Sequence, residues 1–122
     1  MGLAPSTARR VLAAVRIVNG LAGLLYPQFV LRRLGTDPRR DRSGMYPFRM
    51  FGVRTVLLGA DLLSSEADVR RHATRLAVVV HATDTASSLV AAARGDLPRR
   101  QAVMTTLISA SNTVLALRAG RE

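Results

Sequence analysis

The chain has 122 residues, of which 48% are hydrophobic and only 4% aromatic, and this predicts a single domain with a core of Leu, Val and Ala. It contains no cysteine, which excludes disulfides, thiolate catalysis and cysteine-bound metals. The net charge of +10 allows three partners: nucleic acid, anionic lipid headgroups, or water around a charged surface. All the basic residues are arginine, and they bracket apolar segments instead of following one helix face. We therefore expect a lipid bilayer as partner and no nucleic acid.

The first apolar stretch covers residues 8–26. It predicts a helix that ends before Pro27, because proline lacks the backbone donor that a helix interior needs. Residues 29–35 (FVLRRLG) have the pattern of a short amphipathic helix, and the arginine-rich loop TDPRRDRSG follows. We expect this connection to lie at the membrane surface.

Three further apolar stretches predict helices over residues 46–63, 67–93 and 98–119. Pro47 suits the first turn of a helix, and Gly95 suits the end of one. The four stretches have the length that crosses a hydrocarbon layer of about 30 Å. The sequence therefore predicts one all-α domain over residues 1–122, a four-helix bundle that spans the membrane.

The composition also leaves a soluble four-helix bundle open. The mean hydropathy is only +0.17, and an arginine or aspartate in the middle of a span costs roughly 2.5–3.5 kcal/mol on insertion scales. Against this alternative, residues 102–117 offer only Thr, Ser and Asn as polar side chains, whereas a soluble surface helix shows charges. We expect a multi-pass protein of a bacterial plasma membrane.

Polar residues recur at helical spacing within each apolar stretch. Arg16, Asn19 and Gly20 share one face of the first helix, so the guanidinium lies beside a notch of small residues that lets another helix approach. The other helices carry similar stripes, which include Arg54 and Asp61 in the second and His81 in the third. If the four stripes turn inward, they form a buried polar site while Leu, Val and Ala face lipid.

Two interpretations of this polar interior stay open. Ionisable residues inside a membrane are typical of substrate or proton pathways. On that basis the candidate catalytic residues are Asp84, Asp61 and His81, and the candidate substrate-binding residues are Arg16, Asn19, Arg49, Arg54 and Asn112. Alternatively, two arginines and two aspartates neutralise one another and fix the helix register. The spacing of the two histidines does not fit a metal motif, and we expect no metal and no cofactor.

The chain resembles the small four-helix membrane proteins of unknown function, DoxX-like and related, that are abundant in actinobacteria. The matching motifs are Arg16-x-x-Asn19-Gly20, Leu25-Tyr26-Pro27, the RRLG that ends at Gly35, Arg49-x-x-Gly52-Val53-Arg54, Leu58-Gly59, and Asp84 in a helix rich in Ala and Val. This resemblance implies a four-helix architecture that spans the membrane. The redox role linked to DoxX-like proteins is not carried over, because the chain lacks cysteine and a haem-type histidine pair.

Three functions follow as expectations. The first is an accessory or subunit protein of the membrane, with a possible homo-oligomer or membrane complex as its assembly. The second is a cofactor-independent membrane enzyme of the cyclase or isomerase type, which resembles small helical proteins encoded among biosynthetic genes and uses a buried aspartate as general acid. The third is a soluble helical bundle that binds a small apolar ligand.

Overall fold

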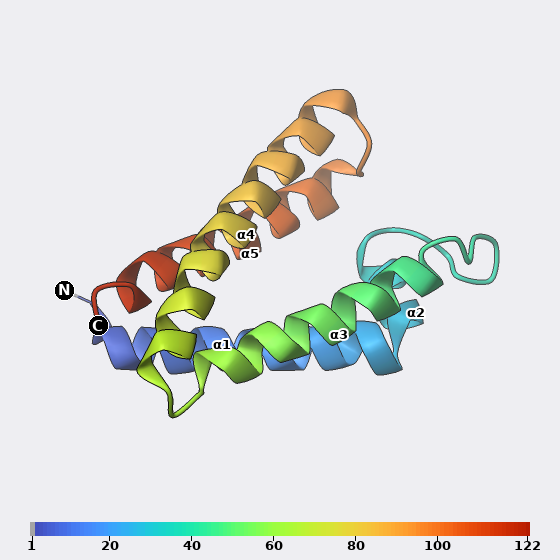
Figure 1. Ribbon diagram of the computed structural model, residues 1–122. Helices are drawn as coiled ribbons and strands as arrows, with labels where there is room; N and C mark the ends of the chain where they lie inside the picture. The colour runs from blue at the N-terminus through green and yellow to red at the C-terminus, as the bar shows by residue number, and fades with distance from the viewer. Residues whose placement is uncertain (1) are drawn as a thin grey trace.

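The computed structural model describes residues 2–122, and within that part of the chain it contains helices and no strand (Figure 1). The helices are α1 (Pro5–Leu25), α2 (Pro27–Arg33), α3 (Met45–Leu62), α4 (Ala67–Arg94) and α5 (Arg99–Ala119). The prediction of an all-α fold is confirmed. The five helices are four long ones and α2, the short helix predicted between the first two; α2 begins at Pro27, two residues earlier than predicted, and lies at an angle of 108° to α1. Gly95 ends α4 in a left-handed conformation with φ of 71°, as its position in the sequence predicts.

The long helices form two antiparallel hairpins, α1 with α3 and α4 with α5. The second hairpin crosses the first obliquely (Figure 1). Helix α1 contacts α5 as well as α3, whereas the contact between α3 and α4 is much less extensive. The four long helices therefore do not close evenly around one axis, and the seam between α3 and α4 stays open.

Glycines allow α1 and α3 to approach closely. A Cβ atom added at Gly52 would lie 2.5 Å from both the Gly20 carbonyl oxygen and the Leu24 nitrogen, and one added at Gly23 would lie 2.8 Å from the Phe48 carbonyl oxygen. These neighbours are backbone atoms, which cannot move aside without separating the helices. The predicted notch beside Arg16 is thus confirmed as the contact surface between α1 and α3.

Gly52→Ala is expected to destabilise the fold by about 1–3 kcal/mol, because the new methyl group pushes α3 away from α1. Gly120→Ala is the matched control, since its Cβ would lie 3.4 Å from the nearest atom, the Leu117 carbonyl oxygen. Thermal unfolding of both variants, followed by circular dichroism, measures the difference. Equal midpoints for the two variants would show that the hairpin tolerates a wider spacing.

The apolar core is small. Its buried members lie where the two hairpins meet, and they are Leu12, Ala13, Leu62, Ala73, Ala77 and Ala116. The accessible surface of 7791 Å² exceeds the roughly 6,400 Å² expected for a compact monomer of this mass. Many large apolar side chains of α4 and α5 are exposed, among them Val79, Leu89, Val103, Leu107 and Leu117. Exposed apolar surface of this kind favours a contact with lipid or with another protein.

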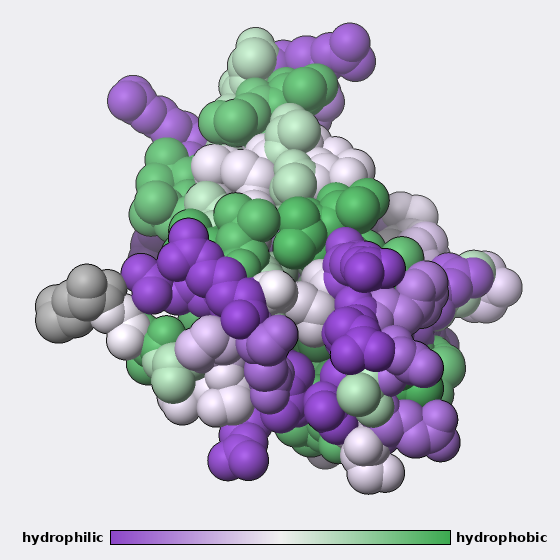
Figure 2. Space-filling model, turned by 60° about the vertical axis from the view of Figure 1, so that its left-hand side comes forward, coloured by the Kyte–Doolittle hydropathy of each residue, from purple (hydrophilic) through white to green (hydrophobic). Residues whose placement is uncertain are grey.

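In the part of the chain that the structure describes, two helices, α4 and α5, are long and apolar enough to cross a membrane. Figure 2 shows apolar side chains gathered between a hydrophilic tip and a hydrophilic base. In α5, residues 101–117 carry no charge, and this segment is about 26 Å long. Helix α1 meets the same criterion only together with the bent α2, and α3 does not meet it. The prediction of membrane-spanning helices is confirmed by length and composition for two helices, and the prediction of four crossings is not.

Candidate functional site

Arg16 and His81 meet in the interior between α1 and α4. Nη1 of Arg16 lies 2.6 Å from Nε2 of His81, and the two residues are only 4% and 5% exposed. A guanidinium can only donate, so Nε2 of His81 must accept, and the imidazole is neutral with its proton on Nδ1. The sequence placed both residues on the polar stripes, and the structure brings them together.

The guanidinium of Arg16 is not fully satisfied. Its Nε is buried and has no hydrogen-bond partner, and among the described residues no carboxylate lies within ion-pair distance of it. Buried charges are normally paired, because taking an ion out of water costs several kcal/mol. Arg16 and Asp84 attract each other without forming an ion pair. The site therefore holds a buried positive charge with one donor that makes no hydrogen bond.

A groove of about 440 Å³ opens at the seam between α3 and α4, and Arg16 forms part of its wall. Most of the lining is apolar and comes from Tyr46, Pro47, Met50, Phe51, Leu58 and Val80. The polar lining consists of Arg16, Arg54, Thr55 and Asp84. An apolar hollow with a few convergent polar groups is the usual form of a small-molecule site.

Asp84 lies on the α4 side of this groove. Its carboxylate is 50% exposed, and its Oδ2 is 3.9 Å from Nδ1 of His81, which is too long for a hydrogen bond. Arg54 lies on the α3 side and is exposed. The two side chains thus frame the groove from opposite helices, with Arg16 contributed by α1.

The remaining predicted site residues do not join this group. Asp61 and Arg49 are exposed on α3 and do not line the groove. Asn19 lines a separate cleft, and Asn112 is buried on α5 outside the groove. The expected pairing of two arginines with two aspartates is therefore absent among the described ion pairs. Thr55 and the apolar wall were missed, because their residue types do not differ from those of an ordinary core.

Arg9 is a second buried arginine that the sequence did not single out. Its Nε donates to Oε2 of Glu122 at 2.7 Å, and its Nη1 donates to the carbonyl oxygen of Leu62 at 2.5 Å. Arg9 therefore ties α1 to the end of α3 and to the residues after α5. The hydrogen-bond partners of Arg9 belong to the chain itself, so we propose no ligand for it.

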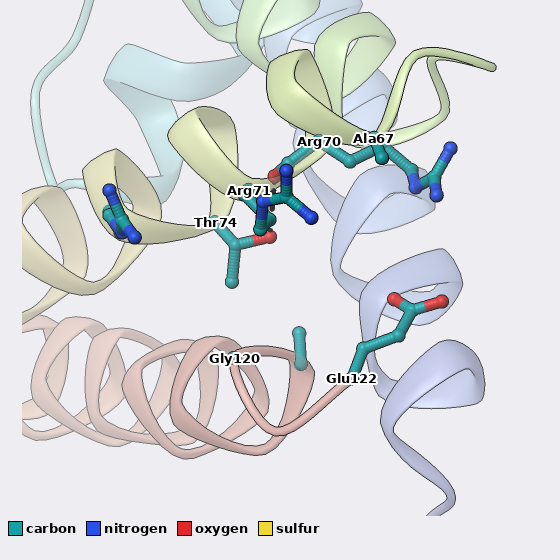
Figure 3. Close-up of a pocket in the computed structure, with 8 residues that line it drawn as sticks. Ala67, Arg70, Arg71, Thr74, Gly120 and Glu122 are labelled. Carbon is teal, nitrogen blue, oxygen red and sulfur yellow. Dashed lines mark hydrogen bonds between the residues drawn. The ribbon is translucent and has the colours of Figure 1, made fainter.

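A smaller hollow of about 240 Å³ lies near this tie (Figure 3). Arg70, Arg71 and Thr74 line it from α4, opposite Gly120 and Glu122. Its basic side chains are mostly engaged, since Arg70 donates to the carbonyl oxygens of residues 64 and 65, and Arg71 pairs with Asp68. This hollow is a weaker candidate than the groove at Arg16.

Acidification is expected to weaken the contact between Arg9 and Glu122. The hydrogen bond from Arg9 holds the pKa of Glu122 below its usual 4.5. The contact therefore contributes stability at pH values above 4.5 and loses it as the pH falls through the lowered pKa. Glu122→Gln removes the titrating carboxylate of this contact. Between pH 6 and pH 3, the unfolding midpoint of the variant should therefore fall less than that of the wild type. Parallel losses in both proteins would contradict the assignment.

No group of three or more metal-ligating His, Asp or Glu side chains occurs in the described part of the chain. Comparison with protein-family models, with curated proteins and with solved structures finds no match. The resemblance to DoxX-like proteins accordingly stays a prediction. The function proposed below is based on the groove at Arg16.

Proposed function

We propose that this chain is a small helical membrane protein whose groove binds a mostly apolar molecule bearing one carboxylate or carbonyl group. The observation that carries the proposal is Arg16, a buried guanidinium beside an apolar groove with an unpartnered Nε. An acceptor oxygen of the ligand would satisfy that donor. The proposed role of Arg54 is to reach the same oxygen group from α3.

The open seam supports this proposal. The groove lies between α3 and α4, and α4 is one of the two helices with the length and composition of a membrane span. An apolar ligand dissolved in the bilayer could therefore reach the groove sideways, without passing through water. A purely structural subunit would leave the charge of Arg16 uncompensated, which the free energy of burial disfavours.

Membrane location is tested by fractionation of cells that express the protein. We expect the chain to stay in the membrane pellet after a carbonate wash and to need detergent for release. Recovery in the soluble fraction would overturn the membrane part of the proposal. It would favour a soluble ligand-binding bundle with the same groove.

Ligand binding is tested with a medium-chain fatty acid that carries a diazirine in its alkyl chain. On illumination of the purified protein, we expect labelling of groove residues such as Met50, Leu58 and Val80. The matched alcohol lacks a charged acceptor and should label far less. Equal labelling by acid and alcohol would contradict the role of the arginines.

Arg54→Gln is expected to lower the affinity for the fatty acid about tenfold or more, because it removes a charge-assisted hydrogen bond worth roughly 1.5–3 kcal/mol. Arg75→Gln is the control, since Arg75 is also an exposed arginine but lies outside the groove. The apparent affinity is measured as the concentration dependence of cross-linking. A similar loss of affinity in both variants would mean that binding of the fatty acid depends only on the net charge of the protein.

A second candidate function is a cofactor-independent enzyme, and one observation favours it. The carboxylate of Asp84 borders the groove without an arginine partner within ion-pair distance. Such a carboxylate can exchange a proton with a bound molecule, whereas a fully paired one cannot do so readily. In this proposal Arg16 and Arg54 polarise a carbonyl group of the substrate while Asp84 moves the proton.

A further inference from the structure

A second cleft, of about 260 Å³, is formed by α1, α2, α3 and α5. Its apolar lining includes three aromatic rings and comes from Phe29, Val30, Leu34, Phe48, Phe51 and Ile108. Phe51 also lines the groove at Arg16, so its ring is part of both walls. The cleft is thus a separate apolar hollow, and the function proposed above does not use it.

A basic hollow of similar size adjoins this cleft. It is lined by Arg32, Arg33, Arg100, Gln101 and Met104, and it shares Arg33 and Met104 with the cleft. Among the residues that the structure describes, no acidic one lines either hollow. One continuous surface therefore changes from apolar to strongly basic at Arg33.

The contacts of Arg33 hold it at this boundary without neutralising it. Its guanidinium carbon lies 5.7 Å from the centre of the Phe29 ring, and its Nη2 donates to the Met104 sulfur at 3.3 Å. A ring face and a thioether are weak partners without net charge. Arg32 and Arg100 are exposed and make no ion pair among the described residues. Three positive charges therefore remain uncompensated beside the apolar cleft.

We propose that this surface binds one anionic phospholipid, with an acyl chain in the cleft and the phosphate at Arg32, Arg33 and Arg100. Guanidinium groups recognise phosphate oxygens by charge-assisted, often paired hydrogen bonds. A headgroup that also carries a positive charge is disfavoured beside three arginines. The proposal depends on the membrane location proposed above, but not on the ligand of the groove.

The test is a titration of purified protein in micelles with phosphatidylglycerol, followed as the shift of the unfolding midpoint. We expect a saturable rise with phosphatidylglycerol and a much smaller one with phosphatidylcholine of the same chains. Soluble glycerol phosphate should give no comparable rise, because it cannot occupy the cleft. An equal rise with phosphatidylcholine would overturn the headgroup assignment, and an equal rise with glycerol phosphate would indicate a site for free anions.

Variants separate a built site from general surface charge. The double variant Arg33→Gln with Arg100→Gln should bind phosphatidylglycerol at least tenfold more weakly. Arg42→Gln, in the exposed loop that follows α2, should change binding less than twofold. Ile108→Trp should also weaken binding, because it narrows the cleft and leaves the charge unchanged. The single variant Arg33→Gln removes the same charge as Arg42→Gln and should weaken binding more. If the two single variants lose the same affinity, the binding is diffuse and the proposed site is wrong.

The two proposals can fail separately. Arg54→Gln alters the groove, so it should leave the shift with phosphatidylglycerol intact. The double variant at Arg33 and Arg100 should leave fatty-acid labelling in the groove intact. If the carbonate wash releases the protein, the same titration without detergent still decides whether the basic cleft selects phosphatidylglycerol.

Discussion

The double variant Arg16→Leu with His81→Leu is expected to be at least as stable as the wild type and to have lost the fatty-acid ligand. The substitution removes a buried charge and the acceptor it uses, Nε2 of His81, at the same time. Replacing a buried polar pair by apolar residues of similar volume is often neutral or stabilising by about 1–4 kcal/mol. Loss of Arg16 also removes a guanidinium that lines the groove, so cross-linking of the fatty acid should fall to the level of the alcohol.

The single variant His81→Leu should behave differently. It leaves the guanidinium of Arg16 buried without its acceptor, and breaking such a pair from one side costs about 3 kcal/mol or more. We therefore expect a stability order in which the single variant is lowest and the double variant is at or above the wild type. Thermal unfolding and cross-linking on the same preparations measure both quantities.

This comparison decides between the two interpretations of the polar interior. If Arg16 and His81 fix the register of α1 against α4, the double leucine variant loses stability or changes its assembly state. If they serve a ligand, stability is retained and binding is lost. A double variant that unfolds as readily as the single one would support the structural interpretation. A double variant that still cross-links the fatty acid more than the alcohol would contradict a binding role for Arg16.

The sequence predicted the elements because they depend on local rules. Proline at position 27 and glycine at position 95 mark helix ends in the structure as they do in the sequence. The notch of small residues at Gly20 predicted a close helix contact, and the backbone of α3 lies against it. Helical spacing likewise predicted that Arg16 and His81 lie on interior faces.

The site was predicted only in part, because helical spacing gives a face but not the neighbour that covers it. Asp61 was expected on the same face of α3 as Arg54, seven residues further along, but this spacing corresponds to about 10 Å, and the groove includes only Arg54. The oblique crossing of the two hairpins also leaves α3 and α4 apart, so a symmetric inward arrangement of four stripes is not formed. Such a crossing depends on long-range packing, which no local pattern specifies.

Asp84→Asn is expected to keep the fold and to slow proton exchange with a bound ketone strongly. The side chain is half-exposed, and its nearest charged or titratable contact among the described residues is the 3.9 Å approach to His81, so an asparagine of the same shape should fit. In the wild type, Arg16 and Arg54 would polarise the carbonyl group of a medium-chain methyl ketone. The carboxylate of Asp84 would take a proton from the carbon beside that carbonyl, and in heavy water it would return a deuteron.

The rate of deuterium incorporation into the ketone, measured by mass spectrometry, should fall by about 10²–10⁴ in the Asp84→Asn variant, which is the usual contribution of a positioned acid–base group. Asp61→Asn is the matched control, because Asp61 is exposed on α3 and does not line the groove. If wild-type protein exchanges no faster than buffer while fatty-acid binding persists, the enzymatic proposal fails and the binding proposal stands. If Asp61→Asn slows exchange as much as Asp84→Asn, the reaction occurs outside the groove, since only Asp84 borders it.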